Sequence, residues 1–294
     1  MDFENVAIIQ QIASSLCAAL TAMFLKQVKE LDFNQTLYLR GLCGFIILFY
    51  TVNHYKFLVN EFDNRTMKIL IERGILASFG AFIYFKGLDL VLVSESIILN
   101  RMSPIWTSMI QIVILKKEKL NFRLILNMLL CSLGIYLVAK NKNSNKQNND
   151  VEDGYYHSIG IILILLASIT QAIVNILIKQ VNKEVDSIVI TFYQSFFSMV
   201  YPSFNSILLE SNFIIPSQND AFLILIMSFL STFAGVLQVK AMKFGKLSVI
   251  SNVSQIQIFF GYLIDLFIFK VQFNLEQILG NVLLLFSLIP LVWK

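Results

Sequence analysis

The chain contains two copies of one sequence pattern, and this internal repeat constrains its fold more than any other feature. Leu25-Lys26-Gln27-Val28 recurs as Ile178-Lys179-Gln180-Val181, 153 residues later. From about Phe79 to the end, a shift of 154 residues aligns the two copies without a gap. Identical pairs include Lys86 with Lys240, Ser94 with Ser248, Lys116 with Lys270, Asn127 with Asn281, and Lys140 with Lys294. A repeated unit of several helices in an apolar chain is typical of secondary transporters.

The composition indicates that this repeated unit lies in a bilayer. Hydrophobic residues make up 56% and charged residues 14% of the 294 positions, whereas soluble domains carry roughly 25% charged residues. A soluble fold could not cover so much apolar surface, but lipid accepts it. The net charge of +4 is spread between apolar stretches and forms no basic patch. We therefore expect the lipid bilayer as a partner and no nucleic acid.

Ten segments are long and apolar enough to cross the hydrocarbon core, which takes about 20 residues of helix. The expected spans are 6–27, 35–54, 68–88, 92–115, 121–140, 158–179, 187–208, 219–240, 246–269 and 274–293. The predicted fold is therefore an all-α integral membrane protein with ten transmembrane helices.

A polar, Asn-rich stretch from Asn141 to Asp153 separates the two sets of five spans. Its composition is typical of a flexible linker. We expect a first five-helix repeat at 1–140, a linker at 141–157 and a second five-helix repeat at 158–294. Because five is odd, the second repeat enters the bilayer from the opposite side, which makes this an inverted repeat.

The distribution of basic residues predicts the orientation of the chain. With a cytoplasmic N-terminus, 13 Lys and Arg residues fall on the cytoplasmic side and 7 on the other. The positive-inside rule then places both termini in the cytoplasm. The Asn64-Arg65-Thr66 sequon faces the cytoplasm in this topology and stays unglycosylated. The sequence is compatible with the plasma membrane or an endomembrane, and it does not indicate the oligomeric state.

Arg101 is the first candidate for a substrate-binding residue. It lies near the middle of the span 92–115, where a charge costs about 2.5–3.5 kcal/mol to insert, so it either lines a solute pathway or pairs internally. Glu95, in the same span, is a further substrate-binding candidate and also the rival explanation, as an internal partner for Arg101. Pro104 removes the hydrogen bond that the Asn100 carbonyl would accept and predicts a kink. A free carbonyl beside an arginine suits a polar or anionic solute such as a carboxylate or phosphate.

The ninth span is the counterpart of the fourth. Gln255 aligns with Arg101, and Ile258 aligns with Pro104. We therefore expect the second repeat to keep the polarity but to lack both the charge and the kink. Asn252, three residues before Gln255, shares its face. The two either contact the solute or join helices by hydrogen bonds.

Four more polar residues inside spans are secondary substrate-binding candidates. Gln171 and Asn175 are spaced i,i+4 on one helix face, and Gln194 aligns with Arg40. Arg40 either lines the site or reaches the headgroups. Arg73, near the cytoplasmic end of its span, is interpreted as an interface anchor whose long side chain reaches toward water.

The polar segments carry no signature of catalysis. The sequence has no Gly-rich phosphate loop, no Cys/His cluster and no Ser/His/Asp set on its short loops. We expect no enzyme activity, no cofactor and no metal site.

The block from Arg73-Gly74 through Glu118 resembles the drug/metabolite transporter superfamily, in particular its EamA-type ten-helix members and the G branch of solute carrier family 35, and the repeat extends this likeness over nearly the whole chain. The matching features are Arg73-Gly74, Glu95, Ser103-Pro104 and Lys116-Lys117-Glu118-Lys119. The resemblance implies two inverted five-helix repeats around a central cavity and transport of a small polar metabolite by alternating access. Arg101 and Ile258 depart from the family pattern, which has a small or apolar residue and a proline there.

The sequence thus predicts a secondary transporter that carries a small-molecule solute, polar or anionic, by alternating access. One alternative is a polytopic membrane binding or assembly protein that transports nothing, with Arg101 neutralised by Glu95. A channel is a third alternative, although no ring of like charges lines any span. The sequence names neither the solute nor a coupling ion.

Overall fold

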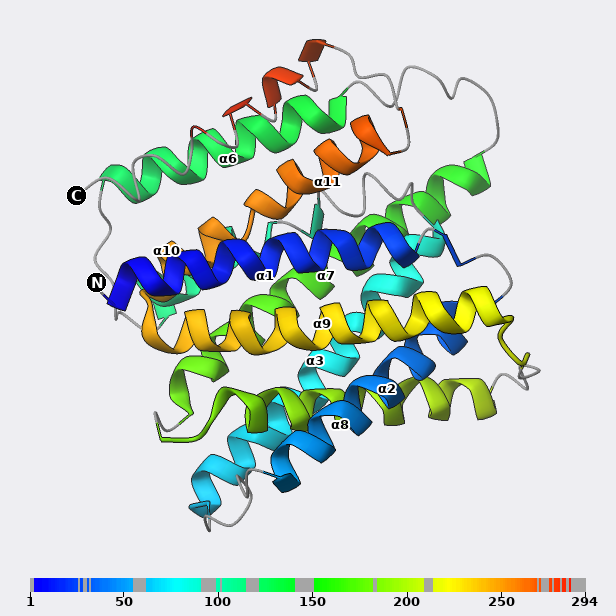
Figure 1. Cartoon of the computed structure of the whole chain (residues 1–294). Coiled ribbons are helices and arrows are strands. Elements are labelled where there is room, and N and C mark those ends of the chain that lie inside the picture. Colours follow the sequence, from blue (N-terminus) through cyan, green and yellow to red (C-terminus); the bar gives the residue numbers. More distant parts are fainter. Residues whose placement is uncertain are drawn as a thin grey trace. The chain divides into compact units, whose positions relative to one another are not determined.

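The computed structural model describes most of residues 3–268 and parts of 270–286 as helices joined by short turns (Figure 1). No β-strand occurs in these described residues. The residues outside the description are 1–2, 26, 29–30, 32, 55–61, 91–98, 101, 115–121, 141–150, 182–183, 209–213, 269, 271–274, 277, 281, 284–285 and 287–294.

The chain folds into two compact units, and each unit takes segments from both repeats. Unit 1 consists of Met1–Phe79 and Ile176–Gly245, and unit 2 of Gly80–Asn175 and Lys246–Lys294. Two helices continue from one unit into the other, namely α3 (Asn64–Leu90) and α7 (Val151–Gln180). Each unit therefore combines helices of both repeats.

Unit 1 contains four further helices. They are α1 (Phe3–Leu25), α2 (Phe33–His54), α8 (Ser187–Leu208) and α9 (Gln218–Phe244). Helix α1 packs along α9, and α2 packs against both α8 and α9 (Figure 1). Each of these pairs joins a helix of the first repeat to one of the second.

Small and hydroxyl-bearing residues bring the helices of unit 1 close together. A methyl group at Gly41 of α2 would lie 3.1 Å from the backbone nitrogen of Met199 on α8, a contact tight enough that the two helices would have to move slightly apart. Between α1 and α9, the Ser14 hydroxyl donates to the Ala234 carbonyl at 2.8 Å. Small residues at close helix contacts and hydroxyl hydrogen bonds between helices are both common where helices associate within lipid.

Unit 2 is built from shorter helical pieces. They are α5 (Ser103–Met109), a π-helix η1 (Ile110–Ile114), α6 (Phe122–Lys140), α10 (Leu247–Val253) and α11 (Ile256–Phe267). Helix α10 of the second repeat packs against α5 of the first.

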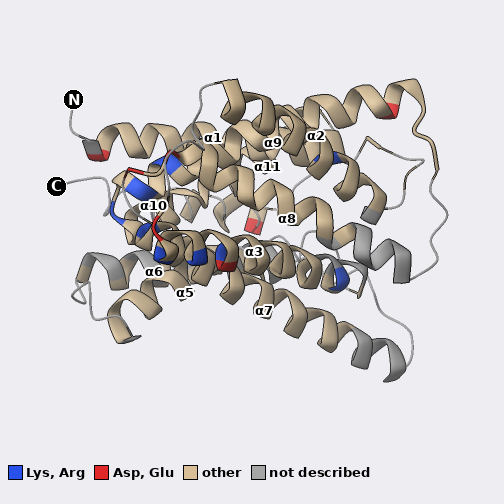
Figure 2. Cartoon of the chain, turned by 90° about the horizontal axis from the view of Figure 1, so that it is seen from below, with Lys and Arg blue, Asp and Glu red and all other residues tan. Residues whose placement is uncertain are grey.

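Among the described residues, five stretches of helix are long and apolar enough to cross a membrane: Glu4–Leu25, Gln35–His54, His157–Gln180, Gln218–Phe244 and Leu247–Ile264. Charged residues of α1 and α9 sit near the helix ends (Figure 2). Large apolar side chains on α9, such as Phe222 and Phe229, are more than half exposed, as expected for a lipid-facing surface. The all-α membrane fold is confirmed, while the count of ten spans includes segments outside the described residues.

The linker differs from the expectation at 141–157. Helix α7 begins at Val151, so residues 151–157 are helical, and 141–150 lie outside the described residues. The last residues of the expected linker are therefore helical, and a flexible linker over 141–150 stays a prediction.

Candidate functional site

A two-residue turn interrupts the helix of the predicted ninth span. Helix α10 ends at Val253 and α11 begins at Ile256, with a turn at Ser254 and Gln255. Within the turn, the Gln255 N–H donates to the Asn252 carbonyl at 3.0 Å, and the Ile258 N–H donates to the Gln255 carbonyl at 2.9 Å. These bonds span three residues where an α-helix spans four.

Side-chain hydrogen bonds to the backbone explain this break. The Ser248 carbonyl accepts from the Asn252 amide at 2.7 Å and from the Ser251 hydroxyl at 3.1 Å, and the Ser251 carbonyl accepts from the Ser254 hydroxyl at 2.5 Å. Such bonds compete with the regular helix ladder. Ser254 and Gln255 keep right-handed helical backbone angles, so the turn tightens the helix locally three residues before Ile258. The expectation that the second repeat lacks a kink stays a prediction.

Pro104 lies at the start of a described helix. Helix α5 begins at Ser103, with Pro104 in its first turn and Met102 preceding it. The Ile105 and Trp106 N–H groups both donate to the Met102 carbonyl, at 2.9 and 3.2 Å. Proline is well tolerated there because the first residues of a helix have no intrahelical acceptor. Pro104 thus stands in the first turn of α5. Residues 91–98 and Arg101 lie outside the described residues, and the expected kink stays a prediction.

Two sequence-predicted residues of this region cannot be placed. Arg101 and Glu95 lie outside the described residues. Their proposed pairing, and the contact of Arg101 with a solute, stay predictions.

Helix α5 passes directly into the π-helix η1 at Ile110. π-Helices are rare and often occur at functional sites. The buried Gln111 lies on this segment. The sequence Ile-Gln-Ile-Val-Ile carries no signal of a π-helix, so this feature could not be foreseen.

Polar side chains without charge gather on α5, η1, α10 and the following turn, and we name this set the α5–α10 polar cluster. All its members are buried: Ser103, Thr107, Ser108, Gln111, Ser248, Ser251, Asn252, Ser254 and Gln255. The cluster joins the repeats through the contact between α5 and α10. Asn252 and Gln255, both predicted from the sequence, belong to it.

Some side-chain polar atoms of the cluster form hydrogen bonds with the backbone of the cluster, and others have no partner among the described residues. The Thr107 hydroxyl donates to the Ser103 carbonyl at 2.9 Å. In contrast, the Ser108 hydroxyl and the Asn252 amide oxygen are fully buried and have no hydrogen-bond partner among the described residues, and the same holds for the indole nitrogen of the neighbouring Trp106. A buried polar group without a partner costs about 1–3 kcal/mol. Such groups favour the binding of a ligand that completes their hydrogen bonds.

Gln171 and Asn175 form a second polar pair within unit 2, on α7. The Gln171 amide donates to the Asn175 side-chain oxygen at 3.0 Å, and Asn175 is buried. The i,i+4 spacing correctly predicted that the two side chains share one helix face.

In unit 1, Arg73 turns inward and contacts α8. Its Nη1 donates to the Ile190 carbonyl at 3.0 Å and its Nη2 to the Gln194 side-chain oxygen at 2.8 Å. Arg73 is 3% exposed, so its interpretation as an interface anchor is wrong. The adjacent Gly74 permits this geometry, because a side chain there would meet the Phe197 ring of α8.

The buried Arg73 carries a charge that no described carboxylate neutralises. The ion pair found among the described residues joins Lys68 and Glu72 at 3.8 Å, on the exposed side of α3. The Arg73 Nε has no hydrogen-bond partner in the described part of the chain.

Of the two predicted site residues in this region, Gln194 contacts Arg73. Arg40, which aligns with Gln194 in the repeat, is half-buried on α2. The position of Arg73 inside a span was the sequence signal for its burial.

These features define a polytopic α-helical membrane protein made of two repeats, with polar side chains buried inside its apolar helices. The sequence model of the EamA-like transporter family matches residues 5–140 and again residues 158–293, once in each repeat. The chain therefore belongs to the EamA-like transporter family, whose members are membrane transporters. The narrower likeness to solute carrier family 35 stays a prediction.

Solved structures agree with this assignment at the level of the fold. A crystal structure of a protein with 11% sequence identity superposes with a TM-score of 0.81, covering 98% of this chain and 97% of the other. Helix arrangement is thus preserved where the sequence is not. No curated protein matches the chain.

Proposed function

We propose that this transporter carries a small polar or anionic metabolite by alternating access, and that the α5–α10 polar cluster contacts the solute. The observation that carries this proposal is the pair of fully buried, unpartnered polar atoms on two touching helices, the Ser108 hydroxyl on α5 and the Asn252 amide oxygen on α10. Family membership supports transport, and these atoms supply a donor and an acceptor for a polar solute.

The turn between α10 and α11 supports the same proposal. Broken helices near the bilayer midplane are where many secondary transporters bind solute, because helix ends present backbone groups that lipid cannot satisfy. The turn also offers a point at which one half-helix can move relative to the other. We propose that the two repeats rock about this region, with both termini on the cytoplasmic side.

The charge of the solute depends on which further residues reach it. The described members of the cluster are neutral, which favours hydroxyl and amide groups on the solute. Arg101, outside the described residues, is the proposed contact for an anionic group. The solute is therefore either neutral and polar or carries a carboxylate or phosphate.

A ligand screen on the purified full-length protein tests this proposal first. Nucleotide sugars, amino acids, organic phosphates and nucleobases are compared for their effect on the melting temperature, since a ligand of the folded state raises stability. We expect one class to raise it in a saturable manner. No stabilisation by any class would contradict the proposal.

The location of the site is then tested with variants in proteoliposomes. Asn252→Leu should abolish uptake of the identified solute while the protein remains folded. Asn219→Leu, at an exposed position near the start of α9, serves as the matched control and should transport normally. Normal uptake by Asn252→Leu would exclude the cluster as the solute site.

The same assay separates the two alternative functions. A binding or assembly protein would bind ligand without moving it, and a channel would show flux that does not saturate. Saturable uptake with exchange across the membrane supports the transporter alone.

A further inference from the structure

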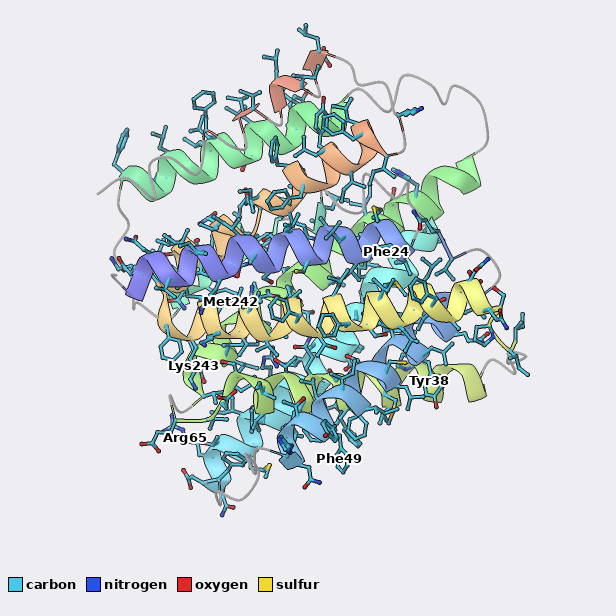
Figure 3. All side chains as sticks on the ribbon, viewed as in Figure 1. Phe24, Tyr38, Phe49, Arg65, Met242 and Lys243 are labelled. Carbon is cyan, nitrogen blue, oxygen red and sulfur yellow. The ribbon has the colours of Figure 1, made fainter. Side chains whose placement is uncertain are left out.

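Three backbone carbonyls at the end of α9 converge on one ammonium group. The Lys179 Nζ, from the last turn of α7, donates to the carbonyls of Met242 at 3.3 Å, Lys243 at 3.0 Å and Gly245 at 2.5 Å. All four residues belong to unit 1. Figure 3 labels Met242 and Lys243 near this end of α9.

These carbonyls are available because α9 ends without the usual backbone cap. The last four carbonyls of a helix have no intrahelical donor, and a left-handed glycine often redirects the chain so that following N–H groups bond to them. Here Gly245 is extended, with φ −84° and ψ 171°, and its N–H donates to the Ala241 carbonyl at 2.9 Å. The following carbonyls are left to another donor.

The helix does not use its own terminal lysine for this purpose. Lys243 is 3% exposed, and its Nζ donates to the Val185 carbonyl in the turn between α7 and α8. The cation at the end of α9 comes instead from α7. Lys179 of α7 thus contacts the end of α9, and Lys243 of α9 contacts the turn that follows α7.

We propose that the carbonyls of Met242, Lys243 and Gly245 form a binding site for a small monovalent cation, which the Lys179 ammonium occupies as a tethered ligand. Carbonyl oxygens can replace the hydration shell of such a cation. The negative end of the helix dipole adds to the attraction. The Lys179 side chain is exposed, so ions from solution can reach the site once the ammonium is removed.

The site lies at the junction between the two units along the chain. Gly245 is the last residue of unit 1, and the chain continues directly into α10, which carries Asn252. The cation in this site is the Lys179 ammonium in the wild type and a small ion in a variant without it. In either case it holds the segment that connects α9 to the α5–α10 polar cluster. This role does not depend on the identity of the solute.

The test measures cation-dependent stability of the purified full-length Lys179→Met variant, which keeps the apolar stem of lysine and removes its charge. Melting temperatures are recorded in sodium, potassium, methylammonium and choline chloride at equal ionic strength. In choline, which is too large for the site, we expect the variant to melt at least about 2 °C below wild type. At least one small cation should restore the loss, and wild type should melt equally in all four salts.

Two variants serve as controls. Lys240→Met removes an exposed lysine from the same end of α9 and should show neither the loss nor the salt dependence. Lys179→Arg keeps a charge at the site and should also be insensitive to the choice of salt. If Lys179→Met is not recovered in folded form, Lys179→Gln is measured in the same way.

The proposal is overturned if Lys179→Met melts with wild type in choline. It is equally overturned if the variant is destabilised to the same extent in all four salts, since Lys179 would then act only through packing and hydrogen bonds. The same salt dependence in wild type or in Lys240→Met would place the cation elsewhere.

Discussion

Arg73 on α3 donates a hydrogen bond of 2.8 Å to the Gln194 side chain on α8, and this bond joins the first repeat to the second inside unit 1. Aligning the repeats does not predict it. Gln194 aligns with Arg40, and Arg73 aligns with Met227, so one repeat supplies both arginines and the other supplies neutral side chains. The contact therefore breaks the symmetry of the repeat.

Gln194→Leu should destabilise the protein, because it removes an acceptor from a buried guanidinium. Hydrogen bonds to charged groups contribute about 1.5–3 kcal/mol, and we expect a loss of that size in the free energy of unfolding, measured by titration with denaturing detergent. Gln180→Leu, at an exposed position on α7, is the control. A variant as stable as wild type would show that the contact contributes nothing.

The double variant Arg73→Met/Gln194→Leu should be more stable than Gln194→Leu alone. Replacing both members of a buried polar pair by apolar residues of similar size avoids leaving a charge without its partner. The same detergent titration on the two single variants and the double variant gives the coupling energy. Additive effects would mean that the two side chains act independently.

Ser108→Ala should separate binding from stability. The hydroxyl is buried without a partner, so its removal should leave the melting temperature unchanged or raise it. Affinity for the transported solute, measured by calorimetry, should fall. Ser228→Ala is the matched control in unit 1, because that buried hydroxyl already donates to the Ile224 carbonyl at 2.6 Å. The control should bind the solute like wild type.

Removing the hydroxyls at the α10–α11 turn should make the helix more regular. In Ser251→Ala/Ser254→Ala, the Ser248 and Ser251 carbonyls lose side-chain donors that compete with the helix ladder. Hydrogen exchange of the amides at 254–258 should slow, and uptake should slow with it. Unchanged exchange would assign the break to Asn252 alone.

Asn64 tests the proposed orientation. It is the first residue of α3 and begins an Asn-Arg-Thr sequon. With cytoplasmic termini, expression in a glycosylating host should yield a chain whose electrophoretic mobility is unaffected by glycosidase. A glycan on Asn64 would reverse the topology.

Several features of the site were predictable because they depend on residue type and spacing. The i,i+4 spacing of Gln171 and Asn175 placed their side chains together, and the polarity of Asn252 and Gln255 inside an apolar span indicated burial. The break before Ile256 was not predictable from proline. It depends on which of several competing hydrogen bonds the Asn252 amide and the neighbouring hydroxyls form.

The sequence by itself determined that this is an all-helical membrane protein of two repeats, because apolar length and periodic recurrence do not depend on packing. Only the tertiary structure decided the use of the individual charges. Arg73 could reach the headgroups or the interior, and its burial follows from the close approach of α8 at Gly74. Lys179 lies near a span end like several other lysines, and its role follows from the uncapped end of α9 beside it. In both cases the deciding partner lies on a helix distant in sequence, so no local pattern could identify it.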